Sequence, residues 1–135
     1  MKLVLTMFVA LAVAGSALAA PKTATLTIRH ELHGCHSWSL DGTSWRATQS
    51  ITLARGSVLT VVDNDVMPHT LIQANGRGVK AAITGATMKR IGAKAHVVFT
   101  AKGTYIFTTK TGEDYMKGVK TIGEDNVLKL VVTVV

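Results

Sequence analysis

The chain has 135 residues, a formal net charge of +7 and an apolar fraction of 47%. This length suits one domain with its own hydrophobic core, and the apolar fraction excludes a disordered chain. A basic charge suits acidic partners or nucleic acid, but the lysines and arginines are scattered along the sequence. We therefore expect an ordinary solvated surface and no nucleic-acid binding.

The N-terminus has the layout of a secretory signal peptide. Lys2 precedes an apolar run from Leu3 to Val13, and Ala17-Leu18-Ala19 has the small residues of a cleavage site. The run is short for a membrane span, which takes roughly 20 apolar residues. We therefore expect residues 1–20 to be removed on export and residues 21–135 to form one domain. That domain would be periplasmic or secreted, with no integral membrane segment.

Short strands separated by turn residues fill the remaining sequence. Thr23 to His30 alternates, so that Leu26, Ile28 and His30 share one face of a strand. The same reading predicts strands at 51–54, 57–63, 69–73, 95–100, 104–109 and 127–135. It predicts a loop or broken strand at 31–42, leaves room for one short helix in 79–95, and predicts a polar loop at 110–126. Many short strands indicate an all-β antiparallel sandwich or barrel.

The single cysteine stands among histidines. Cys35 lies within the segment RHELHGCHSW, which also carries His30, His33 and His36. Exported proteins use cysteines mainly in disulfide pairs, so a lone one is a thiol, an intermolecular bridge or a metal ligand. A thiolate with imidazoles suits copper, zinc or iron. The alternative is a buried thiol beside incidental histidines, and His30 could simply be a core residue because it continues an inward face.

A second candidate segment is VVDNDVMPHTL, from Val61 to Leu71. It joins two strands through an Asp/Asn-rich loop and a Pro-His pair, and it resembles the cupredoxins, the plastocyanin- and azurin-like copper proteins. The segments KGTYIF, beginning at Lys102, and Met116-Lys117-Gly118 resemble that family's G-T-Y-x-F strand and the end of its ligand loop. The resemblance implies a Greek-key β-sandwich or barrel of about seven or eight strands, with His69 and Met116 as copper ligands.

Two ligand positions depart from the family pattern. Thr109 stands where the family has its cysteine, and residues 112–115 contain no second histidine. The segment around Cys35 offers both missing donor types, and in the cupredoxin arrangement the connection after the first strand lies at the copper end. We therefore predict a relocated copper site.

Its ligands would be Cys35 as thiolate, His33 or His36, His69, and Met116 as a weak axial contact, with Glu113 or Asp114 as alternatives to Met116. An extended chain favours His33 beside Cys35, whereas a turn favours His36. We expect Met67 to line the loop, although it could be a second soft ligand.

These residues predict an exported copper protein, with zinc as the less fitting ion. Its role would be electron transfer, or copper carriage and sequestration. Its partner would be a redox or copper-trafficking protein, and the basic charge of the chain suits an acidic one. No candidate general base accompanies the donors, so we expect no enzyme activity. The alternative is a metal-free interaction module of the same fold.

Overall fold

The computed structural model describes residues 18–112 and 121–135, and within them the chain forms strands and no helix. The strands are β1 (Thr23–Glu31), β2 (Cys35–Ser39), β3 (Thr48–Leu53), β4 (Ser57–Asn64), β5 (His69–Gln73), β6 (Ala82–Thr84), β7 (Thr87–Met88), β8 (Ala93–Phe99), β9 (Gly103–Thr111) and β10 (Lys129–Val134). The expected all-β class is therefore confirmed. The signal-peptide prediction concerns residues that lie almost entirely outside the described part.

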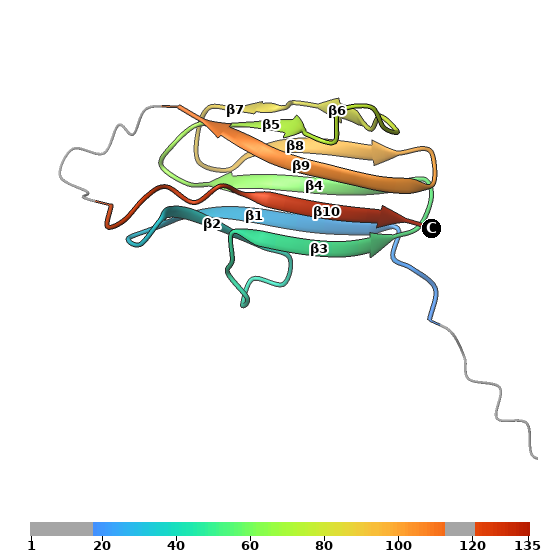
Figure 1. Ribbon diagram of the computed structural model, residues 1–135, viewed down its shortest axis with the longest axis horizontal. Coiled ribbons are helices and arrows are strands. Elements are labelled where there is room, and N and C mark those ends of the chain that lie inside the picture. The colour runs from blue at the N-terminus through green and yellow to red at the C-terminus, as the bar shows by residue number, and fades with distance from the viewer. Residues whose placement is uncertain (1–17, 113–120) are drawn as a thin grey trace, which may run out of the picture.

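The strands form two stacked five-stranded sheets (Figure 1). One has the order β2-β1-β4-β8-β6 and the other the order β3-β10-β9-β5-β7. The sandwich is confirmed, but the sheets are mixed rather than purely antiparallel, because β1 pairs with β4 and β3 pairs with β10 in parallel. Each of these parallel pairs joins strands whose connection runs through other elements, as parallel pairing requires.

Two segments differ from their predictions. Residues 35–39, within the expected loop or broken strand, form β2, an edge strand whose five residues are all buried and therefore show no alternation. The short helix allowed in 79–95 does not form. That segment instead holds β6, which pairs with β8, and β7, which pairs with β5. Gly85 separates the two with a φ of 67°, a conformation that glycine adopts at little cost.

The core lies between the sheets and is built from alternate positions of the strands. On β4, for example, Leu59 and Val61 are fully buried while their neighbours are partly exposed. Phe99 packs edge-on against Tyr105 and Phe107, with ring centroids 4.9 and 6.0 Å apart. Such aromatic pairs add to the stabilisation that burial itself gives.

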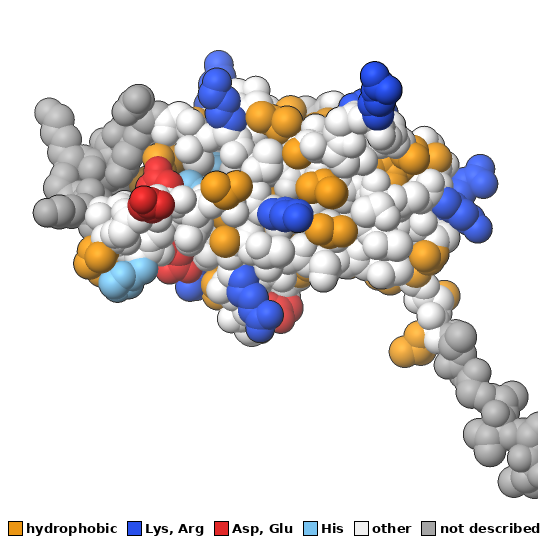
Figure 2. All heavy atoms as spheres, in the orientation of Figure 1, with side chains coloured by type: hydrophobic (Ala, Val, Ile, Leu, Met, Phe, Trp, Pro, Cys, Tyr) orange, Lys and Arg blue, Asp and Glu red, His pale blue; other side chains and the backbone are white. Residues whose placement is uncertain are grey.

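The surface carries the basic charge in a dispersed form. On the face drawn in Figure 2, lysine and arginine side chains are spread over the sandwich, and the histidine and most of the acidic side chains lie toward one end. This agrees with an ordinary solvated surface. None of the described residues belongs to a helix long and apolar enough to cross a membrane.

Candidate metal centre

The inward-facing positions become polar at one end of the sandwich. The core-facing row of β1 runs from Leu26 and Ile28 to His30, and that of β4 runs from Val61 to Asp63. On β9, Tyr105 and Phe107 give way to Thr109 in the same alternation. His69 is the first residue of β5 and is fully buried. Polar side chains from several strands are therefore enclosed together beyond the apolar core.

The turn between β1 and β2 brings further donors to this end. Gly34 and Cys35 have φ values of 77° and 69°, and the amide of His36 donates to the carbonyl of Gly34 at 2.8 Å. This is a three-residue turn centred on Cys35, a strained form for a non-glycine residue. Both Cys35 and His36 are buried as a result, with 3% of each exposed.

Asn126 fixes this turn from the far end of the sequence. Its amide donates to the Gly34 carbonyl at 2.8 Å, and its side-chain amide donates to the His36 carbonyl at 3.0 Å. A Cβ atom on Gly34 would lie 2.4 Å from Nδ2 of Asn126. Glycine is therefore required at position 34 both for its φ value and for the close approach of Asn126.

His36 presents one ring nitrogen to the interior. Its Nε2 lies 2.6 Å from the carbonyl oxygen of Asn126, and because a carbonyl only accepts, Nε2 carries the proton. Nδ1 is buried and has no hydrogen-bond partner among the described residues. Burial lowers the pKa of His36, which favours the neutral ring. A buried lone pair therefore points into the cluster.

His69 is held at both nitrogens. Nε2 lies 2.9 Å from Oδ2 of Asp65, and Nδ1 lies 2.9 Å from the hydroxyl of Thr109. Burial alone would raise the pKa of Asp65, but the hydrogen bond and the charge of His69 outweigh it, so that the pKa is lowered. An ionised Asp65 accepts from Nε2–H, and the Thr109 hydroxyl lies at the other ring nitrogen. Thr109 thus faces the same histidine.

Asp65 also reaches a second histidine. Its Oδ1 lies 3.3 Å from Nδ1 of His30 and accepts from the amide of Met67 at 3.2 Å. Its neighbour Asp63 is fully buried, accepts from the Asp65 amide at 2.9 Å, and leaves Oδ2 without a partner among the described residues. Burial raises the pKa of Asp63 to about 6. The two carboxylates are thus buried within the polar cluster, and Asp65 contacts two of its histidines.

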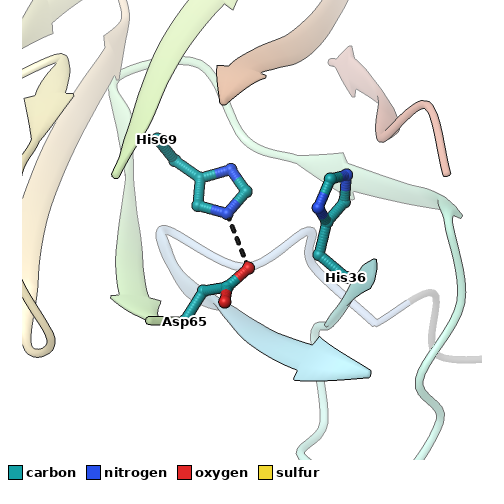
Figure 3. A group of neighbouring side chains, drawn as sticks. All are labelled: His36, Asp65 and His69. Atoms are coloured by element: carbon teal, nitrogen blue, oxygen red, sulfur yellow. Dashed lines mark hydrogen bonds and ion pairs between the residues drawn. The ribbon is translucent and has the colours of Figure 1, made fainter. Parts of the chain in front are cut away.

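The two buried histidines meet across the gap between the sheets. Their ring centroids are 5.2 Å apart and their planes are nearly perpendicular, at 85°. One donor atom from each of His36, Asp65 and His69 can be chosen so that all three lie within 4.8 Å of one another. Figure 3 shows the two imidazoles facing each other with the Asp65 carboxylate beside them. The segments that carry His36 and His69 also carry two sulfur atoms, Sγ of Cys35 and Sδ of Met67. These two atoms lie 3.1 Å apart.

Some of the predicted ligands lie at this polar end of the sandwich and others do not. Cys35, His36 and His69 lie at the same end of the sandwich, and the donor atoms within 4.8 Å of one another come from His36, Asp65 and His69 and do not include Sγ of Cys35. His33 is exposed on the turn, where it forms a bridge to Ile122, so the turn directs the His36 ring and not the His33 ring into the cluster. Met116, Glu113 and Asp114 lie outside the described residues.

Two carboxylates of the cluster and one asparagine were not among the predicted ligands. Asp63 continues the inward alternation of β4, and Asp65 extends it just beyond the end of the strand at Asn64, which is a signal that the sequence contains. Met67 was expected to line the loop, with a role as a second soft ligand as the alternative, and it contacts Cys35. No local pattern indicates Asn126, because its contacts span 90 residues of sequence.

The donors fit a transition metal. His36 Nδ1 is a buried, unpartnered lone pair in the part of the chain that the structure describes, and backbone carbonyls and carboxylates commonly hold the far nitrogen of metal-binding histidines. Imidazole and thiolate donors suit copper and zinc, whereas a carboxylate would add a harder oxygen donor. Coordination by His69 would replace either its Thr109 hydrogen bond or the proton that it shares with Asp65.

No protein-family model matches the chain, and no curated protein matches its sequence. Solved structures to which the chain is similar include a purple cupredoxin from Nitrosopumilus maritimus, 16% identical over 83% of this chain and 99% of that chain, with a TM-score of 0.46. An oxidized amicyanin mutant is 16% identical over 89% of this chain and 87% of that one, with a TM-score of 0.46. A cysteine protease inhibitor from Entamoeba histolytica is 7% identical over 85% and 99%, with a TM-score of 0.42. These similarities concern the fold alone, and the β-sandwich itself is given by the two five-stranded sheets.

Proposed function

We propose that the chain is an exported copper-binding protein that acts in electron transfer or in copper carriage and is not an enzyme. The observation that carries this proposal is the pairing of His36 with His69. Each ring has its Nε2 held, by the Asn126 carbonyl and by Asp65, and His36 offers a buried Nδ1 without a partner among the described residues. Cys35 supplies a thiolate donor from the adjacent position.

The donor set favours copper over zinc. Two imidazoles with a thiolate and a thioether form the set of a copper electron-transfer centre. A redox or copper-trafficking protein would then be the partner, and the dispersed basic surface suits an acidic one. The site is enclosed between the sheets, which suits either a redox centre or a tightly held cargo ion. The N-terminal segment supports export, which would put the site in the periplasm or outside the cell.

A metal-free interaction module is the second candidate, and one observation favours it. Both nitrogens of His69 already have hydrogen-bond partners within the protein, so the hydrogen bonds of this ring are satisfied without an ion. A polar network of this kind can serve only to fix the packing at that end of the sandwich.

Copper titration of the purified protein without its first 20 residues separates the two candidates. We expect one Cu(II) per chain and a visible thiolate-to-copper absorption band that disappears in Cys35→Ser. His36→Gln should weaken binding at least tenfold. His96→Gln should leave it unchanged, because His96 lies on the exposed face of β8. Absence of stoichiometric copper binding in the wild-type protein would refute the copper proposal and support the interaction module.

A further inference from the structure

Cys35 and Met67 bring two sulfur atoms into contact, whereas His36 and His69 offer nitrogen donors. The two sulfur atoms are 3.1 Å apart, and the Cys35 thiol is the donor toward the thioether. Both side chains are buried, with 3% and 6% exposed. Cys35 directly precedes His36, and Met67 lies two residues before His69. Two soft donors therefore accompany the two imidazoles on the same pair of segments.

We propose that Cys35 and Met67 together bind the cuprous ion, so that Met67 supplies the thioether and the site selects Cu(I) over Cu(II). This inference rests on the copper-binding function proposed above and deepens it. Thiolate and thioether sulfur prefer Cu(I) among the biological copper states. His36, the next residue along the chain, would add a third donor through its buried Nδ1, which has no partner among the described residues.

The contact can open into a metal site with a small movement. Binding would replace the thiol proton that now lies between the sulfurs. Sulfur donors at about 2.3 Å from an ion lie roughly 3.8 Å apart in tetrahedral geometry, so the pair would separate by less than about 1 Å. Methionine is unbranched and adapts readily to such changes.

The backbone around Met67 is fixed on both sides. The Met67 amide donates to Oδ1 of Asp65 at 3.2 Å, and the Pro68 carbonyl accepts from the amide of Gly112 at 2.9 Å. A Cβ atom on Gly112 would lie 2.5 Å from Cγ of Pro68, so the two segments are closely packed. The thioether is therefore held toward Cys35 before any ion binds, which lowers the entropic cost of binding.

The test compares Met67→Leu with Met88→Leu. Met88 is a fully buried methionine on β7 that belongs to the apolar core, so its variant controls for loss of a buried thioether. Met-to-Leu changes keep the volume, and both variants should fold. Cu(I) affinity is measured anaerobically by competition with a chromophoric Cu(I) chelator. X-ray absorption at the copper edge counts the sulfur neighbours.

We expect wild type to show two sulfur neighbours, and Met67→Leu to show one and to bind Cu(I) at least tenfold more weakly. Cu(II) affinity should fall less, and Met88→Leu should match wild type. If Met67→Leu does not fold, the sulfur counts of wild type and of Met116→Leu decide, because two sulfur neighbours in both leave Met67 as the thioether and one in Met116→Leu overturns the inference.

Equal Cu(I) affinity in wild type and Met67→Leu would overturn the inference while leaving the copper-binding function intact. An equal loss in both methionine variants, or loss of a sulfur neighbour only in Met116→Leu, would also overturn it. Failure of wild type to bind either copper ion would instead overturn the proposed function.

Discussion

Asp65 joins two histidines that belong to different sheets. One carboxylate oxygen lies 2.9 Å from Nε2 of His69 on β5, and the other lies 3.3 Å from Nδ1 of His30 on β1. The carboxylate thereby fixes the tautomer and the ring orientation of His69. Outer partners of this kind typically contribute 10–100-fold to metal affinity.

Asp65→Asn should therefore weaken copper binding by about 10–100-fold. Asparagine keeps the size of the side chain but cannot act as a charged acceptor toward both rings. The thiolate-to-copper band should persist, because Cys35 is unchanged. Competition titration measures the affinity, with the exposed Glu124→Gln as the control at the same end of the molecule. An affinity equal to that of wild type would show that Asp65 does not position His69.

Asp63 gives the stability of the metal-free protein a pH dependence. Burial raises its pKa from 3.8 to about 6, so the folded state holds the proton more tightly than the unfolded state does. Protonated Asp63 contributes to the free energy of unfolding, and this contribution is fully present below pH 3.8. It is lost as the pH rises through the folded-state pKa of about 6. The wild type should therefore lose up to about 3 kcal/mol relative to Asp63→Asn between these limits.

Urea denaturation at pH 4.5 and 7.5 measures this difference. Asp41→Asn is the control, because backbone amides of Ser44 and Thr43 lower the pKa of Asp41 and place its titration below pH 4. Its effect should be the same at both pH values. A pH-independent difference between wild type and Asp63→Asn would contradict the raised pKa.

Among the elements, the turn between β1 and β2 depends most on a distant segment. Its three-residue geometry places Cys35 and His36 inward, and Asn126 makes three hydrogen bonds with it, to Gly34 and to both the carbonyl and the ring of His36. The turn is therefore a joint product of the β1–β2 connection and the segment that leads into β10.

A double-mutant cycle at Gly34 and Asn126 tests this dependence. Gly34→Ala should cost more than the roughly 1–2 kcal/mol of a left-handed alanine, because its Cβ collides with the Asn126 side chain. In the Asn126→Ala background the collision is absent, so the cost should fall toward that range. Urea denaturation gives both values, and strict additivity would contradict the close packing of the two residues.

The elements also show which parts of the fold the sequence can predict. β1, β4 and β9 alternate clearly, because one face of each packs on the core. β2 shows no alternation between buried and exposed residues, because all five of its residues are buried, so a period of two does not reveal it. β6 and β7 are only three and two residues long, too short for any period to appear. The parallel pairs are set by contacts between distant segments, which a local pattern cannot contain.

For the site as a whole, the sequence pointed to His69, the histidine of the Pro-His pair, and to the segment around Cys35. The choice between His33 and His36 required the turn, since an extended chain would have turned His33 inward. Asp63 was within reach, because it continues the inward row of β4. Asn126 was not, because a polar residue in a loop carries no sign of its partner.

Copper should stabilise the whole molecule against heat. An ion that binds only the folded state adds about 2.7 kcal/mol when its concentration is 100 times the dissociation constant. For a domain of this size that corresponds to a rise in Tm of several degrees. Scanning calorimetry with and without copper measures the rise, which should vanish in His69→Gln. A Tm that copper leaves unchanged in wild type would contradict binding to the folded state.

Because Asn126 fixes the β1–β2 turn, this turn can take its final form only after Asn126 has been synthesised. Ribosomes make the chain from its N-terminus, so Cys35 and His36 emerge long before the residue that orients them. A nascent chain that ends before Asn126 has its cysteine and histidines but lacks the acceptor that fixes the His36 tautomer. The arrangement of donors is therefore completed only after Asn126 has been made, so we expect metal binding that depends on the His36 ring to follow the synthesis of that segment.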